Sequence, residues 1–342
     1  MISRQSKEKT VSGIFSKIPF SLLRKLTQTN LIIPYYHIVS DDEILHVKHL
    51  YAYKTIRQFK EDMDFLLINY FPIGLLDVLN FIKNGRPLSE KAFLLTFDDG
   101  FREMNDIVAP ILLERGICAT FFVNSAFIEN KQLCYLNKAS LLAEEFMRKR
   151  SLRLEEKLSG MLNANKIEFN DIKSAILLIR YQQRHLLDEI AQVMNLDFTD
   201  YLLMNRPYLT SNQINRLIEK GFTIGAHSID HPFYPSLSLE DQMHQTVESV
   251  KEIREKFCLN YGAFAFPHSD SGVSGRFFKE SYDSGLVDIS FGTGGMLDDS
   301  LKNHLQRFSL EKPLMPAKKI IAFQYARKIY KTVMLRNPVV RA

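Results

Sequence analysis

The chain has little cysteine, no tryptophan, few glycines and no long uninterrupted apolar run. Its three cysteines (Cys118, Cys134 and Cys258) are an odd number without metal-site spacing, so we expect no disulfide framework and a reducing compartment. Fifteen glycines and twelve prolines in 342 residues exclude collagen-like and low-complexity classes. No run reaches the roughly 18 apolar residues of a membrane span. The interrupted apolar stretch near the N-terminus does not fit a secretory signal. These absences predict a cytoplasmic protein.

The chain is rich in apolar residues of the kind usually buried, and its charge is unevenly distributed along the sequence. Hydrophobic residues make up 46% of it, with 25 Phe and 14 Tyr, which excludes general disorder. The net charge of +5 combines +5 in residues 1–26, +8 in residues 312–342 and −8 in between. An acidic body is not typical of nucleic-acid binders, so no nucleic-acid partner is expected. The basic ends also carry apolar residues, which favours peripheral association with the inner face of a membrane. The alternative is two terminal helices packed on the body with a solvated charged face.

Short apolar runs alternate with helical patterns from residue 31 onward. Strands are predicted at 31–39, 92–97, 117–123, 221–227, 262–267 and 285–291, and helices at 55–70, 103–115, about 210–220, 238–257 and 274–284. This rhythm predicts an α/β fold with a parallel sheet or barrel. We divide the chain into a basic leader (1–30), an α/β body (31–312) with a helical insertion at about 125–208, and a basic amphipathic C-terminal helix (313–342).

Two adjacent carboxylates, Asp98 and Asp99, directly follow the predicted strand at 92–97 and precede Gly100. Neighbouring carboxylates repel each other, and the carboxyl ends of strands are where active sites of α/β folds lie. The functional interpretation is one metal ligand beside one general base. An Asp-Asp-Gly turn or helix cap is the alternative.

His227 and His231 lie four residues apart, just after the predicted strand at 221–227. Two imidazoles and a carboxylate form a mixed nitrogen and oxygen set suited to zinc or another divalent ion, with positions left open for water. Two unrelated loop histidines are the alternative. Because both motifs follow strand ends, a shared catalytic metal site is favoured.

The segments TFDDG (96–100) and HSIDH (227–231), with the sequence around them, resemble the polysaccharide deacetylases, a family also called the NodB-homology domain or carbohydrate esterase family four. The resemblance covers about 31–125 and 208–310. It implies a distorted (β/α) barrel, a divalent metal held by Asp99, His227 and His231, and Asp98 as general base. Zinc is the ion we expect.

The chain departs from the family at two motifs. The usual Arg-x-Pro-Tyr motif is replaced by FAFPHSDSG (264–272), in which Pro267 remains and His268 stands in place of the tyrosine. A backbone N–H is still available there for an oxyanion. The later Leu-x-His motif is absent, and Arg307 in LQRFSLE (305–311) is a candidate guanidinium near the base.

A Tyr-His segment, PYYHIV (34–39), resembles the subgroup that deacetylates poly-N-acetylglucosamine and makes His37 the candidate general acid. A buried core histidine is the alternative. The remaining signals are weaker: we expect residues 292–295 to form a rim loop, and five other histidines to be solvated: His46, His49, His185, His244 and His304.

The predicted activity is metal-dependent hydrolysis of N-acetyl groups on amino sugars of a cell-surface polysaccharide or its precursor. The expected partner is therefore an N-acetylated glycan or a lipid-linked glycan precursor. Two alternatives stay open: a non-catalytic glycan-binding module on the same fold, and a metal amidase or esterase with a non-sugar substrate.

Overall fold

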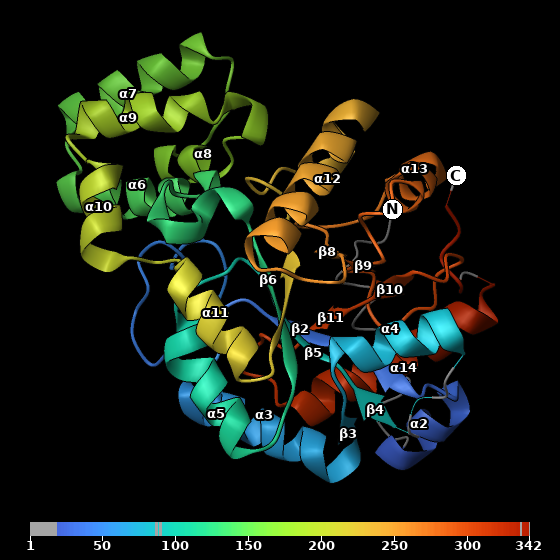
Figure 1. Cartoon of the computed structure of the whole chain (residues 1–342). Helices are drawn as coiled ribbons and strands as arrows, with labels where there is room; N and C mark the ends of the chain where they lie inside the picture. Colours follow the sequence, from blue (N-terminus) through green and yellow to red (C-terminus); the bar gives the residue numbers. More distant parts are fainter. Residues whose placement is uncertain (1–18, 86–87, 89–90, 336, 342) are drawn as a thin grey trace.

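A parallel sheet rolled into a barrel forms the centre of the protein (Figure 1). The computed structural model describes residues 19–85, 88, 91–335 and 337–341. In spatial order the barrel strands are β10 (His304–Gln306), β9 (Ile289–Gly292), β8 (Ala263–Ala265), β7 (Thr223–Ala226), β6 (Ala119–Val123), β5 (Leu95–Phe97), β2 (Pro34–Tyr36) and β11 (Phe308–Ser309). All neighbouring pairs are parallel.

One segment closes this barrel. β10 pairs with β9, and β11, which begins only two residues after β10 ends, pairs with β2 at the other end of the sheet. We call residues 304–311 the closing segment, because its two halves join the two edges of the sheet. The arrangement confirms the predicted distorted (β/α) barrel, but the strand at the closing segment was not predicted.

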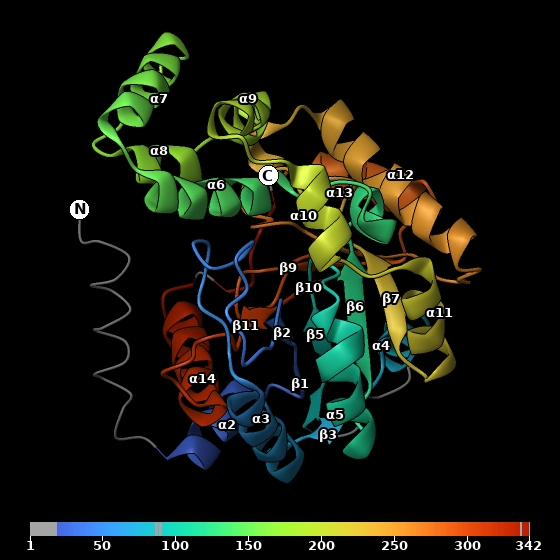
Figure 2. The same cartoon turned by 90° about the vertical axis from the view of Figure 1, so that its left-hand side faces the viewer.

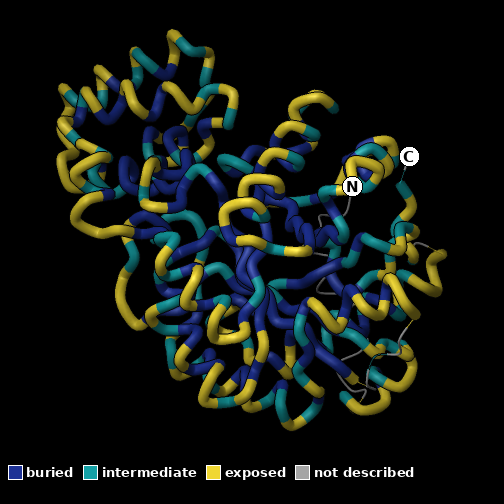
Figure 3. The backbone as a smooth tube through the Cα atoms, in the orientation of Figure 1, coloured by how far each residue is buried: buried dark blue, intermediate teal, exposed yellow. Residues whose placement is uncertain are grey.

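The strands are short apolar runs because the barrel is covered on its outer face by helices and filled on its inner face by side chains. Every residue of β5, β6 and β9 is buried, as the dark blue centre of Figure 3 illustrates. A second, three-stranded sheet contains β1 (Leu31–Ile32), β4 (Ala92–Phe93) and β3 (Phe71–Pro72). Because β1 and β4 lead directly into β2 and β5, this small sheet lies at the amino ends of the barrel strands.

The crossover helices lie around the barrel, all but α4 near positions where the periodicity predicts a helix. They are α3 (Ile56–Asn69), α4 (Leu75–Asn84), α5 (Ala109–Glu114), α11 (Ser211–Glu219), α12 (Leu239–Lys256) and α13 (Gly275–Asp283). Thr55 caps α3, since its hydroxyl accepts the N–H of Gln58. The helix predicted at 103–115 begins instead as a π-helical turn, Met104–Val108, before α5. Pro110, in the first turn of α5, has no N–H to donate back, which fits this widened turn.

Residues 125–205, which follow β6, contain helices and no strand, and we call them the helical segment. It comprises a 3-10 stretch (Ser125–Asn130), α6 (Tyr135–Lys149), α7 (Leu152–Ala164), α8 (Ile172–Leu177), a 3-10 turn (Tyr181–Gln183), α9 (His185–Met194) and α10 (Phe198–Asn205). These helices share an apolar core of their own, which includes Leu142, Leu158 and Leu187 and continues into Phe101 and Tyr208 at the barrel. In Figure 2 they lie over one end of the barrel.

Two helices near the chain ends pack together on the part of the barrel away from the helices of residues 125–205. α2 (Phe20–Thr27) contacts α14 (Ala317–Val333), and α14 also packs on α3 (Figure 2). Residues 1–18 of the predicted leader lie outside the described residues. Among the described helices, none combines the length and the apolar character that crossing a bilayer requires.

Candidate active site

The turn after β5 places Asp98 and Asp99 at the carboxyl end of the barrel. The N–H of Asp98 donates to the carbonyl of Tyr36 on the neighbouring strand, so Asp98 remains in sheet geometry. Asp99 and Gly100 then adopt positive φ angles of 74° and 69°. A Cβ at position 100 would lie 3.1 Å from Val123, so glycine both permits the turn and avoids this contact. The Asp-Asp-Gly turn that was the alternative interpretation is therefore present, and it places both carboxylates in one site.

Arg307 of the closing segment holds Asp98. Its two terminal nitrogens donate to the two carboxylate oxygens at 2.7 and 2.8 Å, and both side chains are buried. Burial alone would raise the pKa of Asp98, but the charge and hydrogen bonds of Arg307, with smaller contributions from His227 and His37, hold that pKa below the usual value. Arg307, the guanidinium predicted near the candidate base, thus binds the Asp98 carboxylate in bidentate geometry.

Asp99, His227 and His231 come together as a group of three potential ligands. Their ligating atoms lie within 4.8 Å of one another, with Oδ1 of Asp99 at 3.4 Å from Nε2 of His227 and 3.3 Å from Nε2 of His231. Nδ1 of His227 lies 2.9 Å from the carbonyl of Ala265, which only accepts, so Nδ1 carries the proton and Nε2 presents a lone pair. Oδ1 of Asp99 is buried and has no hydrogen-bond partner among the described residues. Acceptors that face one another in this way fit a bound cation.

The two histidines converge through a tight turn. Ser228 and His231 have positive φ angles of 68° and 66°, and the Ser228 hydroxyl accepts the N–H of His231. Asn124, directly after β6, donates to the carbonyl of His227 and to Ser228. The turn is therefore fixed by a polar side chain on the neighbouring strand end.

His37, at the end of β2, pairs with Glu311 at the end of the closing segment. Nδ1 of His37 lies 2.6 Å from one Glu311 oxygen, while the other oxygen accepts the N–H groups of His37 and Ile38. Burial acts to lower the pKa of His37, but the charge and hydrogen bond of Glu311, together with the charges of Asp99 and Asp98, outweigh it and raise that pKa to about 9. His37 thus lies at the site rim as a protonated imidazole. Glu311 was not predicted as a site residue, because its only signal is its place two residues after β11, a strand that was itself not predicted.

His268 lies beside the histidine pair. Its ring centroid is 4.6 Å from that of His231, and its φ angle is 55°. Burial lowers the pKa of His268 to about 3, so its ring is neutral. Its backbone N–H, which follows Pro267, donates no hydrogen bond within the described part of the chain. This N–H is the donor expected for an oxyanion.

A cavity of about 410 Å³ joins these groups. It is lined at its base by His37, Asp98, Asp99, His227, His231 and His268. The helical segment supplies part of the wall through Leu136, Asn137 and Leu177, and Tyr51 and Phe266 add aromatic surface. The five residues predicted as catalytic groups and metal ligands thus line one cavity, and Arg307 contacts Asp98.

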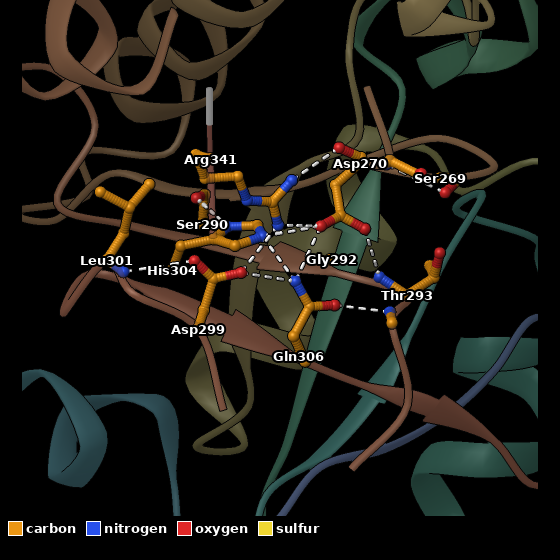
Figure 4. A network of polar contacts seen from close by, with 12 residues as sticks. Ser269, Asp270, Ser290, Gly292, Thr293, Asp299, Leu301, His304, Gln306 and Arg341 are labelled. Atoms are coloured by element: carbon orange, nitrogen blue, oxygen red, sulfur yellow. Dashed lines mark hydrogen bonds and ion pairs between the residues drawn. The ribbon is translucent and has the colours of Figure 1, made fainter. Parts of the chain in front are cut away.

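A second cluster, Asp270, Asp299 and His304, also has ligand atoms within 4.8 Å (Figure 4). Here the guanidinium of Arg341 already supplies the positive charge, since it donates to Asp270 and, at 2.7 Å, to Asp299. The prediction that His304 is solvated was wrong. His304 is buried because its ring nitrogens meet Ser290 at 2.7 Å and Asp270 at 3.1 Å.

Hydrogen bonds that start from Asp270 of this second cluster fix the position of the loop that carries His268. Asp270 accepts the N–H of Thr293, and the Thr293 hydroxyl donates to the carbonyl of His268. The backbone N–H groups of Thr293, Gly294 and Gly295 are all used internally, so residues 292–295 form a rim loop, as expected, and offer no cradle for phosphate. 

The other four histidines that were predicted to be solvated differ in how far they are exposed. His185 and His244 are exposed, as expected. His46 is buried against the hydroxyl of Tyr201, and His49 is only partly exposed against Glu144. The prediction of solvated rings was wrong for both, because partners distant in sequence cover them.

Comparison with known proteins identifies the family. The family model "Polysaccharide deacetylase" matches residues 85–276, more than half of the chain. No curated protein sequence matches. Among solved structures, the chain is similar to the Streptococcus pyogenes deacetylase PplD in complex with acetate (14% identity, TM-score 0.55, 87% of this chain and 99% of that chain). It is also similar to a de-N-acetylase from Aggregatibacter actinomycetemcomitans (14%, 0.54, 86% and 99%) and to IcaB from Ammonifex degensii (13%, 0.52, 87% and 97%). At these identities the likeness establishes the fold, and the family match goes further: the chain belongs to the polysaccharide deacetylases.

Proposed function

We propose that this protein is a metal-dependent hydrolase that removes N-acetyl groups from amino sugars of a cell-surface polysaccharide or its precursor. The main support is that one cavity contains both a carboxylate with a lowered pKa, Asp98, and an imidazole with a raised pKa, His37. Arg307 keeps Asp98 ionised, and Glu311 keeps His37 protonated. Amide hydrolysis needs such a pair, a base for the attacking water and an acid for the leaving amine.

Asp99, His227 and His231 would hold the divalent ion, and zinc is the ion that their nitrogen and oxygen set favours. When bound, such an ion polarises a carbonyl and lowers the pKa of a coordinated water. The buried, unpartnered Oδ1 of Asp99 supports this assignment.

The chain's own residues supply the other steps. Asp98 accepts the proton of the attacking water, and the bidentate Arg307 fixes the orientation of its carboxylate. The N–H of His268 is placed to donate to the oxyanion that forms from the acetyl carbonyl. His37 donates its proton to the nitrogen that leaves as a free amine, while Glu311 orients the ring.

The feature that favours the non-catalytic alternative is the replacement of the Arg-x-Pro-Tyr motif by FAFPHSDSG (264–272). Arg307 supplies, from the closing segment, the guanidinium that this motif lacks, and this supports catalysis over binding alone. The likeness to PplD and to a de-N-acetylase, whose names refer to deacetylation, points the same way. We place the enzyme in the cytoplasm, at the inner face of the membrane, where it would meet lipid-linked glycan precursors or the growing polymer.

The test is release of acetate from N-acetylglucosamine oligomers, measured with chelator and after zinc is added back. Activity should disappear with chelator and return with zinc. Asp99→Ala, His227→Ala and His231→Ala should each lose the ion while the far-UV circular dichroism spectrum stays unchanged. His244→Ala, an exposed histidine on α12, is the matched control and should keep full occupancy.

Several outcomes would contradict the proposal. Full zinc occupancy in His231→Ala would remove that residue from the site. Oligomer binding without acetate release would favour the glycan-binding module. Release of acetate only from non-sugar amides or esters would favour the other hydrolase.

A further inference from the structure

The arm after α14 (residues 337–341) reaches the loop that contains the expected oxyanion donor. Two backbone hydrogen bonds of Val339, of 2.8 and 2.9 Å, attach the arm to residues 298–300. Two residues later, one terminal nitrogen of Arg341 donates to the carbonyl of Asp270 at 2.8 Å, and the other donates to the Asp270 carboxylate (Figure 4). The arm therefore holds both the backbone and the side chain of Asp270.

Asp270 connects Arg341 to His268, the residue whose N–H is placed for the oxyanion. One Asp270 oxygen accepts the N–H of Thr293 at 3.0 Å, and the Thr293 hydroxyl donates to the His268 carbonyl at 3.0 Å. A Cβ at position 292 would lie 2.5 Å from the Asp270 carboxylate, so this carboxylate packs directly on the backbone that leads to Thr293. One carboxylate and one threonine thus join the guanidinium of the arm to the backbone of His268.

The backbone of His268 depends on support of this kind. Its φ angle of 55° lies in the left-handed region, which is unfavourable for a residue with a side chain and persists where neighbours hold it. The direction of the His268 N–H follows from this conformation, because the N–H itself has no hydrogen-bond acceptor in the described part of the chain. A loop released from Arg341 would therefore lose the orientation of this donor.

We propose that Arg341 is a positioning residue, which holds the His268 N–H in the orientation that the oxyanion requires. It acts through Asp270 and Thr293 and does not itself line the active-site cavity. This inference rests on the proposed function and deepens it, because it adds a residue outside the cavity to the reaction. Since the oxyanion forms only after attack on the acetyl carbonyl, a misdirected N–H should lower kcat and leave KM unchanged.

The experiment measures kcat, KM and zinc content with N-acetylglucosamine oligomers as substrates. Arg341→Ala should lower kcat by about 10- to 100-fold, less than the roughly 10²–10³-fold cost of deleting an oxyanion donor outright, with unchanged KM and zinc content. Arg341→Lys keeps a positive charge beside Asp270 and should stay folded. It should still lower kcat, because an ammonium group cannot reproduce the planar two-nitrogen geometry of a guanidinium.

Thr293→Val tests the connection between Asp270 and His268, since it removes one hydroxyl and keeps the size of the side chain. It should also lower kcat at constant KM. Its loss should not add to that of Arg341→Lys in the double variant, because both substitutions act on the same N–H. Unchanged kcat in either folded single variant, or losses that add in the double variant, would overturn the proposal.

Hydrogen–deuterium exchange tests the inference without any turnover. Exchange of the segment 264–273 should be faster in Arg341→Lys than in the unmodified protein, while the segment 119–123 of β6 stays unchanged. The matched control is Arg276→Ala, since Arg276 pairs with Glu280 on the surface of α13 and should alter neither kcat nor exchange. If no oligomer releases acetate, the proposed function fails, and exchange alone then decides whether Arg341 holds this loop. Equal exchange of 264–273 in Arg341→Lys and the unmodified protein would refute that role.

Discussion

Two adjacent aspartates acquire different chemistry because each meets different neighbours. Asp98 lies against the guanidinium of Arg307, whereas Asp99 faces the Nε2 atoms of two imidazoles. An ionised carboxylate fixed by hydrogen bonds is suited to accept a proton, and a carboxylate with a buried oxygen that lacks a hydrogen-bond partner, as Oδ1 of Asp99 does among the described residues, is suited to hold a cation. The adjacency is visible in the sequence, but the division of roles depends on Arg307, which lies 209 residues away.

Asp98→Asn should retain zinc and lose turnover by about 10²–10⁴-fold, the range of general-base contributions. The amide cannot accept the water proton, while Asp99, His227 and His231 are untouched. The measurement is kcat together with zinc content by atomic absorption. Since the substitution leaves Arg307 facing an uncharged group, urea unfolding is measured alongside to confirm that the variant is folded. A loss below about threefold, far outside the general-base range, would remove Asp98 from the mechanism.

Glu311→Gln should move the alkaline limb of the kcat/KM profile to lower pH. His37 acts as an acid only while protonated, so activity falls as pH rises through its pKa, which Glu311 raises to about 9. Removal of the Glu311 charge lowers that pKa, and the acid is lost at lower pH. Glu144→Gln is a matched control, because Glu144 pairs with another histidine, His49, and should leave the limb in place. An unchanged limb in Glu311→Gln would return His37 to the role of a buried structural residue.

At the scale of elements, the sequence predicted the barrel strands well where they are apolar apart from a single threonine. Leu95–Phe97 and Ala119–Val123 are buried on both faces, so composition alone reveals them. The closing segment was missed because it carries His304, Gln306 and Arg307. These polar side chains are buried only because partners from other strands satisfy them, and no local pattern contains that information.

Arg341 should contribute strongly to stability, although it lies on an extended arm after α14. Its guanidinium is the counter-ion of the buried carboxylates of Asp270 and Asp299. Burial would raise the pKa of Asp270, but His304 and Arg341 outweigh it and hold that pKa well below its usual value, so the carboxylate stays charged at neutral pH. Arg341→Ala should therefore lower the free energy of unfolding by about 3–5 kcal/mol, the cost of breaking a buried ion pair.

Urea unfolding at neutral pH measures this effect. Arg276→Ala provides the control, because Arg276 forms an exposed pair with Glu280 and should cost at most about 1 kcal/mol. As pH falls and Asp270 becomes protonated, the difference between Arg341→Ala and the unmodified protein should shrink. Equal unfolding free energies for the two variants would show that Arg341 is not the counter-ion.

At the scale of the whole molecule, the terminal helices expose charge while their apolar faces are largely covered. Ile320, Ile321 and Tyr325 of α14 are buried on the protein, in line with the alternative of packed terminal helices. Removal of residues 312–342 would therefore disrupt the fold. A membrane contact would have to use exposed groups, such as Lys318, Lys319 and, on α2, Leu26.

Binding to anionic vesicles should consequently be salt-sensitive and weakened by the double variant Lys318→Ala with Lys319→Ala. At about 1 kcal/mol for each lysine near an anionic surface, affinity should fall by about 30-fold. Co-sedimentation at low and high salt measures this. Lys251→Ala with Lys256→Ala, two exposed lysines on α12, is the control. Equal recovery with neutral and anionic vesicles, or none with either, would refute membrane association.

The closing segment also has a consequence for the order of folding. Its contacts with the rest of the site span 209 residues, from Asp98 to Arg307, and 274 residues, from His37 to Glu311. Contacts of such long sequence separation form late, whereas the helical segment relies on local pairs of helices. On dilution from urea, helical circular dichroism should recover first, and zinc binding with enzymatic activity should follow in a slower phase. Site assembly then reports the completion of the barrel, because the closing segment also supplies Arg307 and Glu311, the partners of Asp98 and His37.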